Sequence, residues 1–303
     1  MAIPGLHHLT AICGAPQANL DYYVRRLGQR LVKRTVNFDD PGTYHLYYAD
    51  RTGTPGTIMT FFPFADAAPG RAGPGMATAV AYRLPVGELE GWMARLAEDG
   101  EDFRGPFERF GARAIALRDP DGLTVELIED PGAREPMDGF HSVTLWCDDP
   151  EPTARVLTEL FGYEAHGEAR DGEATRLRFA APGGARGAVV DLLHIDAHGI
   201  ARPGAGTIHH VAFRAESDDV QRMWRERVRA FGLSVTPVID RQYFNAIYFR
   251  EPGGVLFEIA TDPPGFAVDE AQEALGSALK LPERYEPRRD DIERRLPPIT
   301  VPS

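Results

Sequence analysis

The chain has 303 residues, of which 43% are hydrophobic and 26% are charged, and its formal net charge is −12. This acidic balance argues against a nucleic-acid partner, because phosphate binding needs a basic surface. The sequence has no apolar run as long as a membrane span and no signal-peptide pattern, so we expect a cytoplasmic protein without membrane contact. Cys13 and Cys147 are too few for a disulfide framework.

One pattern recurs four times along the chain: a strand, a helix that ends at a glycine, and further strands, the last of which follows a Pro-Gly type turn. Apolar residues with i, i+3, i+4, i+7 spacing predict the helices, and the glycine is typical of a helix C-terminus. The four helices precede Gly28, Gly100, Gly162 and Gly232, the last with a slightly different spacing. An internal repeat of roughly sixty residues explains the recurrence best.

The repeats define four modules, and the tail of the chain differs from them. The modules cover approximately residues 3–64, 76–130, 138–197 and 205–262. One helix and a few strands cannot bury both faces of a sheet, so the modules must pair, with helices outside and a curved sheet enclosing a cleft. We group the modules into a first domain, 1–130, and a second, 138–262.

The tail, residues 263–303, is predicted to lie outside the repeat. Its residues 269–281 have the spacing of an amphipathic helix. Residues 282–303 are rich in proline and charge, which predicts an extended arm lying over the body or into a partner.

Two histidine doublets stand in equivalent first strands, His7-His8 in the first module and His209-His210 in the fourth. A lone strand histidine is usually a hydrogen-bonded, half-buried residue, but two doublets in matching places favour a functional use of the imidazole. Successive strand side chains point to opposite faces, so only one histidine of each doublet should face a given cleft.

A carboxylate completes a candidate metal site. Glu258 stands among apolar residues of the last strand, where a buried carboxylate needs a partner or a metal. If the first and fourth modules pair, their four equivalent positions hold His8, His210, Glu258 and Thr60. Two histidines and one carboxylate on one face of a metal suit non-haem Fe(II) and dioxygen chemistry. The alternatives are an ion pair from Glu258 to Arg250 and a core hydrogen bond for His210.

The other pair of modules offers no such set. Its equivalent positions hold Ala79, Glu126, Ser142 and Asp191. Because none of these is an imidazole, we interpret this pair as a structural copy. Ser142 in the ligand register also argues against a site between the third and fourth modules.

Several runs of the sequence resemble one family. They are Leu6-His7-His8-Leu9-Thr10, the run from Arg34 to Tyr48, Gly53 to Thr57, Asp191-Leu192-Leu193-His194, Ile208-His209-His210, and Pro252 to Glu258. With these the chain resembles the vicinal oxygen chelate superfamily and, within it, the hydroquinone ring-cleaving dioxygenases, the group of 2,6-dichlorohydroquinone 1,2-dioxygenase. The resemblance implies an α+β fold of four βαβββ modules, paired into two curved-sheet half-barrel domains with helices outside.

The same resemblance implies an activity and a metal. The metal would be Fe(II), less often Mn(II), held by His8, His210 and Glu258. The enzyme would insert dioxygen into a hydroquinone, plain, substituted or chlorinated, next to a hydroxyl. We expect a small aromatic substrate and dioxygen as partners, and a homo-oligomer.

Catalytic roles are also implied for residues around the metal. They fall on His7, His209, Arg241 and Tyr248: the arginine would hold an anionic oxygen, and a histidine or the tyrosine would move a proton. Tyr44, His45 and Tyr47 are weaker candidates for lining the cleft.

Two other functions stay open. One is a glyoxalase-like metal-dependent lyase or epimerase, which the same fold supports. It usually needs a further ligand at the fourth position, where this chain has Thr60. The other is a metal-free protein that binds an aromatic compound, although such a cleft needs apolar walls and no buried carboxylate.

Overall fold

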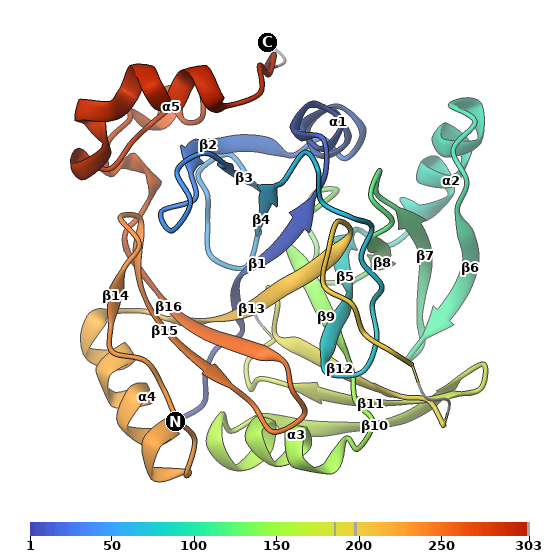
Figure 1. Ribbon diagram of the computed structural model, residues 1–303. Helices are drawn as coiled ribbons and strands as arrows, with labels where there is room; N and C mark the ends of the chain where they lie inside the picture. Colours follow the sequence, from blue (N-terminus) through green and yellow to red (C-terminus); the bar gives the residue numbers. More distant parts are fainter. Residues whose placement is uncertain (185, 197–198, 302–303) are drawn as a thin grey trace.

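The computed structural model describes residues 1–184, 186–196 and 199–301, whose strands form two eight-stranded sheets (Figure 1). The order of the first sheet is β14 (Ile239–Asp240), β15 (Phe244–Arg250), β16 (Leu256–Pro264), β13 (Thr207–Ala215), β1 (Leu6–Cys13), β4 (Ile58–Pro63), β3 (Tyr44–Ala49) and β2 (Arg30–Val36). The order of the second is β10 (Glu164–Asp171), β11 (Ala174–Ala180), β12 (Val189–His194), β9 (Phe140–Trp146), β5 (Met76–Leu84), β8 (Thr124–Glu129), β7 (Ala112–Arg118) and β6 (Arg104–Arg109). Among the described residues, no helix has the length and apolar character needed to cross a membrane.

Each sheet combines strands from the two halves of the chain. In the first sheet, β1 and β13 form an antiparallel pair at the centre, with β4 parallel to β1 and β16 parallel to β13. The second sheet repeats this plan with β5 and β9 at its centre. The predicted α+β architecture of repeated modules in two curved sheets is therefore confirmed. The division into domains 1–130 and 138–262 stays a prediction, and residue 197, the predicted end of the third module, lies outside the described residues.

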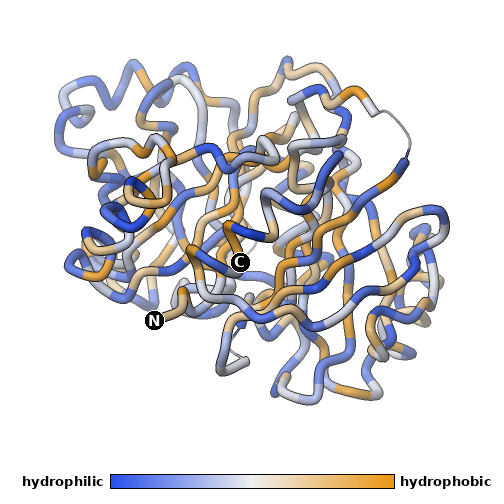
Figure 2. The backbone as a smooth tube through the Cα atoms, turned by 90° about the horizontal axis from the view of Figure 1, so that it is seen from below, coloured by the Kyte–Doolittle hydropathy of each residue, from blue (hydrophilic) through white to orange (hydrophobic). Residues whose placement is uncertain are grey.

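The helices of the modules lie on the outer sides of the sheets (Figure 1). They are α1 (Pro16–Leu20) with a π-helical continuation (Asp21–Arg26), α2 (Leu89–Glu98), α3 (Glu151–Arg155) with a π-helical continuation (Val156–Leu160), and α4 (Asp218–Ala230). All four predicted glycines follow these helices with positive φ angles between 69° and 94°, a conformation in which a side chain would be strained. Apolar residues concentrate along the strands inside the molecule (Figure 2).

The helix predicted over residues 269–281 is wrong. That segment contains one short 3-10 turn, Gln272–Ala274, and the helix of the tail lies later, as α5 (Arg289–Arg295) within the predicted arm. Two further 3-10 turns, Phe266–Val268 and Glu283–Arg288, complete the tail. Residues 302–303, the end of that arm, lie outside the described part of the chain.

Tertiary contacts explain the failure of the helical pattern. Lys33 is fully buried in β2, and its ammonium binds the carboxylates of Asp269, at 2.6 Å, and Glu270, at 2.5 Å. Gly276 has a φ of +77°, which no helix accepts, and a Cβ there would meet the carbonyl oxygen of Leu31 at 2.0 Å. The segment is thus held against β2 by an ion pair and a close backbone approach, which outweigh local helix propensity.

The turn before β8 contains a buried carboxylate with a raised pKa. Oδ1 of Asp119 accepts hydrogen bonds from the backbone N–H groups of Asp121 (3.0 Å) and Leu123 (2.8 Å), and Oδ2 accepts one from the hydroxyl of Tyr23 at 3.3 Å. Burial nevertheless raises the pKa of Asp119 to about 6. Ionisation of Asp119 therefore costs more free energy in the folded chain than in the unfolded chain, which lowers stability at neutral pH.

We predict that Asp119→Asn stabilises the protein above pH 6 by up to about 3 kcal/mol and that this gain disappears as the pH falls toward 4. The pKa of Asp119 is higher in the folded chain than in the unfolded chain. The free-energy cost of burying its charge is therefore absent below the unfolded-state pKa and complete above the folded-state pKa. An asparagine keeps the acceptor for both N–H groups and can donate to Tyr23. Urea unfolding at pH 4.5, 6 and 8 measures the difference.

Asp50→Asn is the matched control, because its effect has the opposite sign. Burial alone would raise the pKa of Asp50, but the side chain and backbone of Thr54 and other turn N–H groups lower it. This substitution should therefore destabilise the protein at neutral pH. A gain for Asp119→Asn that is the same at all three pH values would contradict the explanation.

Candidate metal centre

Both histidine doublets lie at irregularities in the pairing of β1 with β13. Leu6 and His8 pair with the consecutive residues Phe213 and Ala212, so His7 is an extra residue in β1. Thr10 pairs with His210 and Ala11 with Ile208, which makes His209 the extra residue in β13. Such β-bulges interrupt the alternation of side chains. The expectation that only one histidine of a doublet faces the cleft is therefore wrong for His209 and His210, which both line it.

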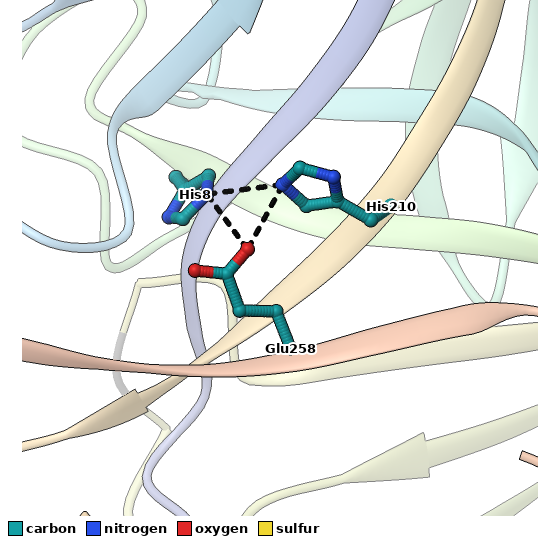
Figure 3. Close-up of side chains that lie close together, drawn as sticks. All are labelled: His8, His210 and Glu258. Atoms are coloured by element: carbon teal, nitrogen blue, oxygen red, sulfur yellow. Dashed lines mark hydrogen bonds and ion pairs between the residues drawn. The ribbon is translucent and has the colours of Figure 1, made fainter. Parts of the chain in front are cut away.

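His8, His210 and Glu258 meet at one point between β1, β13 and β16 (Figure 3). The Nε2 atoms of the two histidines are 3.3 Å apart, and Oε2 of Glu258 lies 3.0 Å from His210 Nε2 and 3.5 Å from His8 Nε2. All three side chains are buried. This is the set that the comparison of modules predicted. The alternative ion pair to Arg250 is not found, because Arg250 donates instead to the carbonyl of Gly254. His210 does make a hydrogen-bond contact, through Nδ1 to His209, and this contact leaves its Nε2 facing Glu258.

The carboxylate of Glu258 needs a cation. Although the two imidazoles lie close, neither Glu258 oxygen has a hydrogen-bond donor among the described residues. Burial lowers the pKa of His210, so its imidazole is neutral at pH 7. Burial alone would raise the pKa of Glu258, and positive charge on His8 and His210 together with their close contacts to the carboxylate holds that pKa below its usual value. A divalent metal would supply that charge while the imidazoles remain neutral ligands, so these residues fit a metal ion.

The extra histidine of each doublet supports the ring beside it. Nδ1 of His8 lies 3.0 Å from Nδ1 of His7, and Nδ1 of His210 lies 2.8 Å from Nδ1 of His209. Each of these contacts takes one proton. When Nδ1 of His8 or His210 carries that proton, Nε2 of the same neutral ring has a free lone pair. Metal binding requires this lone pair, which faces the position beside Glu258. Burial lowers the pKa of His7, and burial together with His210 lowers the pKa of His209 to about 4, so neither carries charge at pH 7.

A cleft of about 540 Å³ is lined by His8 and His210, whereas Glu258 is not among its lining residues. Its walls combine aromatic and aliphatic side chains with several polar and charged ones. They are formed by His8, Ile12, Asn37, Phe38, Asp39, His45, Tyr47, Phe62, Phe64, His209, His210, Arg241, Phe244, Tyr248 and Leu256. A concave site with aromatic and aliphatic walls and converging polar groups is typical of small-molecule binding.

Arg241 and Tyr248 form the polar side of this cleft. Nε of Arg241 donates to the hydroxyl of Tyr248 at 3.2 Å, and Nη1 donates to Asp39 at 3.1 Å. Burial and the neighbouring Glu258 raise the pKa of Tyr248. The tyrosine is therefore protonated at neutral pH, and its hydroxyl is a potential hydrogen-bond donor beside the cleft.

The remaining predicted residues are divided between the cleft and its surroundings. His7 and Tyr44 do not line it, whereas His45 and Tyr47 do. Nε2 of His45 contacts the hydroxyl of Thr60 at 2.8 Å, and the same hydroxyl lies 2.8 Å from that of Thr10. Thr60, at the fourth equivalent position, is thus engaged in other hydrogen bonds.

Asp39 and Phe244 are functional candidates that sequence reasoning missed. Asp39 orients Arg241, and Phe244 packs its ring 4.9 Å from the ring of His8. Asp39 stands inside the run from Arg34 to Tyr48 that carried the resemblance, which was the available signal. For Phe244 the sequence contained no signal except its position between the two candidates Arg241 and Tyr248.

Comparison with known proteins agrees with this geometry. The family model described as "Glyoxalase/Bleomycin resistance protein/Dioxygenase superfamily" matches residues 5–127 and 139–259. The chain is 46% identical to "Putative ring-cleaving dioxygenase MhqO" of Bacillus subtilis (strain 168), over 98% of this chain and 97% of that protein. It is 36% identical to "Chlorohydroquinone/hydroquinone 1,2-dioxygenase" of Sphingobium indicum, over 99% of this chain and 98% of the relative.

Solved structures extend the comparison. A crystal structure titled "putative dioxygenase", from Bacillus subtilis, superposes with a TM-score of 0.92 at 44% identity and covers 100% of this chain and 99% of its own. Glyoxalase I from Zea mays gives a TM-score of 0.66 at 14% identity, over 85% of this chain and 92% of that one, which shows a shared fold alone. The chain belongs to the glyoxalase, bleomycin resistance protein and dioxygenase superfamily.

Proposed function

We propose that this protein is an Fe(II)-dependent ring-cleaving dioxygenase that inserts dioxygen into a hydroquinone next to a hydroxyl. The observation that carries the proposal is the convergence of His8, His210 and Glu258, with both carboxylate oxygens lacking a hydrogen-bond donor among the described residues. Mn(II) is the other metal that this ligand set suits. The relatives named for ring cleavage, one of them for hydroquinone, support the reaction and the substrate class.

His8, His210 and Glu258 would hold the metal, and because His8 and His210 line the cleft, a metal bound there would be accessible from it. Fe(II), when bound, would supply the redox chemistry that lets ground-state dioxygen react with an aromatic ring. The protein then has to bind the ring, orient its hydroxyl toward the metal and keep the site dry. Three ligands from adjacent strands of one sheet give a rigid base for that task.

The cleft has a shape and polarity suited to a flat phenol. Phe244 and Phe62 offer ring faces, and Ile12 and Leu256 add aliphatic surface. Flat aromatic substrates stack well on such walls. At the polar side, the Arg241 guanidinium is fixed by Asp39 and lies next to Tyr248.

Arg241 and Tyr248 act on the charge and proton of the substrate in this proposal. The arginine stabilises the negative charge of an ionised ring oxygen. Tyr248 is protonated at neutral pH and donates to that oxygen, while His209, neutral and facing the same cleft, is the other proton-transfer group. His7 lies behind His8 and acts through it, by fixing the protonation of its Nδ1.

The first prediction from the proposed function concerns metal affinity. Glu258→Gln removes the charge that binds the cation but keeps the volume, so we expect a folded protein that Fe(II) or Mn(II) no longer stabilises. A ligand at about 100 times its Kd should stabilise the parent by about 2.7 kcal/mol. Thermal unfolding under anaerobic conditions, with and without metal, measures this difference.

Glu126→Gln is the matched control, because Glu126 occupies the equivalent position in the second sheet. Its carboxylate binds Arg109 at 2.8 Å, so its loss should lower stability without changing the response to metal. Equal metal stabilisation in the Glu258 variant and the parent would contradict the site.

The second prediction concerns catalysis. Arg241→Gln and Tyr248→Phe should each lower kcat for dioxygen uptake by about a hundredfold, because each removes a group that binds the charged oxygen or supplies a proton. The measurement is dioxygen consumption by Fe(II)-loaded protein with hydroquinone, methylhydroquinone, chlorohydroquinone and catechol.

Arg155→Gln serves as the control for a lost arginine, because Arg155 is exposed on α3 and does not line the cleft. Its rates should match the parent's. If metal-loaded protein consumed no dioxygen with any of the four rings, the proposed function would be wrong and the lyase would become the better candidate.

A further inference from the structure

The second sheet encloses a cleft of about 520 Å³, here called the second cleft. It occupies the place that corresponds to the metal cleft of the first sheet. Its polar and charged lining consists of Arg71, Thr78, Arg104, Arg118, Asp121, Thr124, Glu126, Thr144, Trp146, Asp171 and Arg176. Among the residues that the structure describes, no histidine contributes to this lining, so the second cleft differs in chemistry from the metal centre.

In the second cleft, arginines bind the carboxylates that stand at positions equivalent to those of the metal-centre residues. Asp191, the equivalent of a metal-ligand position, accepts two hydrogen bonds from Arg178, at 2.8 and 2.9 Å, and lies 3.4 Å from Nη1 of Arg176. Asp171 bridges Arg176, at 2.8 Å, and Arg109, at 2.6 Å. Charge-assisted pairs of this kind stabilise carboxylates that would otherwise be costly to bury.

The unsatisfied polar atoms of the two clefts have opposite character. Near the metal position they are the acceptors of Glu258. In the second cleft, among the described residues, they are donors: Nε of Arg176, Nε1 of Trp146, and Nε of Arg109 just behind. Arg176 is only 4% exposed and lines the cleft. Buried donors without acceptors favour a ligand that brings oxygen lone pairs.

The charge around the second cleft also favours a ligand with oxygen acceptors. Arg71, Arg104 and Arg118 are exposed at its rim, and Asp121 is the acidic side chain of the lining outside the buried network. The network itself is balanced, with three guanidinium groups against three carboxylates. The rim therefore leaves a positive excess, in a protein whose net charge is −12. Such a concave positive surface attracts small anions.

The walls between the charged groups are apolar. Ala79, Ala174, Leu193 and Ile195 line the second cleft together with Trp146. Trp146 shares its strand face with Thr144, whose hydroxyl accepts a hydrogen bond from Arg176 at 2.8 Å. An occupant thus meets a flat aromatic surface beside the arginines.

We propose that the second cleft is a binding site for a small organic carboxylate with an apolar body. The carboxylate lies against Arg176 and the rim arginines Arg104 and Arg118, and the body lies along Trp146 and Leu193. A guanidinium fork matches a carboxylate in geometry and charge, and the apolar walls distinguish this ligand from inorganic phosphate. The site is separate from the metal centre and does not depend on the proposed function.

The test is a calorimetric titration of the metal-free protein with benzoate, with benzamide as the neutral analogue and inorganic phosphate as the anion without an apolar body. We expect benzoate to bind at one site per chain, benzamide to show no binding, and phosphate to bind at least about tenfold more weakly. Tryptophan fluorescence should change with benzoate, and Trp146→Phe should abolish that change, because Trp92 and Trp224 lie outside the second cleft.

Variants connect the binding to named residues. The double variant Arg104→Gln, Arg118→Gln should raise the Kd for benzoate at least about tenfold, as should Arg176→Gln, because each loses charge-assisted hydrogen bonds. Arg113→Gln, on β7 and outside the cleft, should leave the Kd unchanged. The two rim residues are exposed, so their double variant remains a test even if Arg176→Gln does not fold.

Three results would overturn the proposal. They are the absence of benzoate binding, a Kd in the rim variant equal to the parent's, and equal affinity for phosphate and benzoate. None of these measurements uses the metal or the enzymatic reaction, so failure here and failure of the proposed dioxygenase can be told apart.

Discussion

The antiparallel pairing of β1 with β13 is the interaction on which the metal centre depends. It joins strands about 200 residues apart and places one ligand from each beside Glu258 of β16. One extra residue in each of the two strands then adds a second imidazole next to each ligand. Without these bulges, strand alternation would turn His209 away from the cleft. Register and ligand orientation are thus set by the same few backbone positions.

Modules of one repeat form two clefts that favour ligands of opposite charge. In the first, the carboxylate of Glu258 leaves negative charge and unsatisfied acceptors beside the neutral imidazole of His210, which suit a cation. In the second, arginines satisfy the carboxylates at the equivalent positions and leave unsatisfied donors, which suit an anion. The difference arises from a handful of side chains on one scaffold, in keeping with the rule that function belongs to sites and not to folds.

The sequence predicted the repeat, the α+β architecture and the three converging side chains. Each had a local signature: apolar spacing before a glycine, a turn before each last strand, and a carboxylate among apolar strand residues. The orientation of His209 had no such signature, because a bulge depends on the register with a partner strand. The contact of Arg241 with Asp39 joins residues far apart in sequence. The helix predicted over residues 269–281 was wrong for the same reason, because contacts with the distant residues Lys33 and Leu31 hold this segment against β2.

The most direct test of the central claim is the fate of isotopically labelled dioxygen. Fe(II)-loaded protein would be supplied with a hydroquinone and ¹⁸O₂, and the ring-opened product would be analysed by mass spectrometry at early times. The account predicts that both atoms of one dioxygen molecule enter the product. A product without the label, formed by the metal-loaded protein, would contradict it and assign the metal centre to a lyase or isomerase reaction.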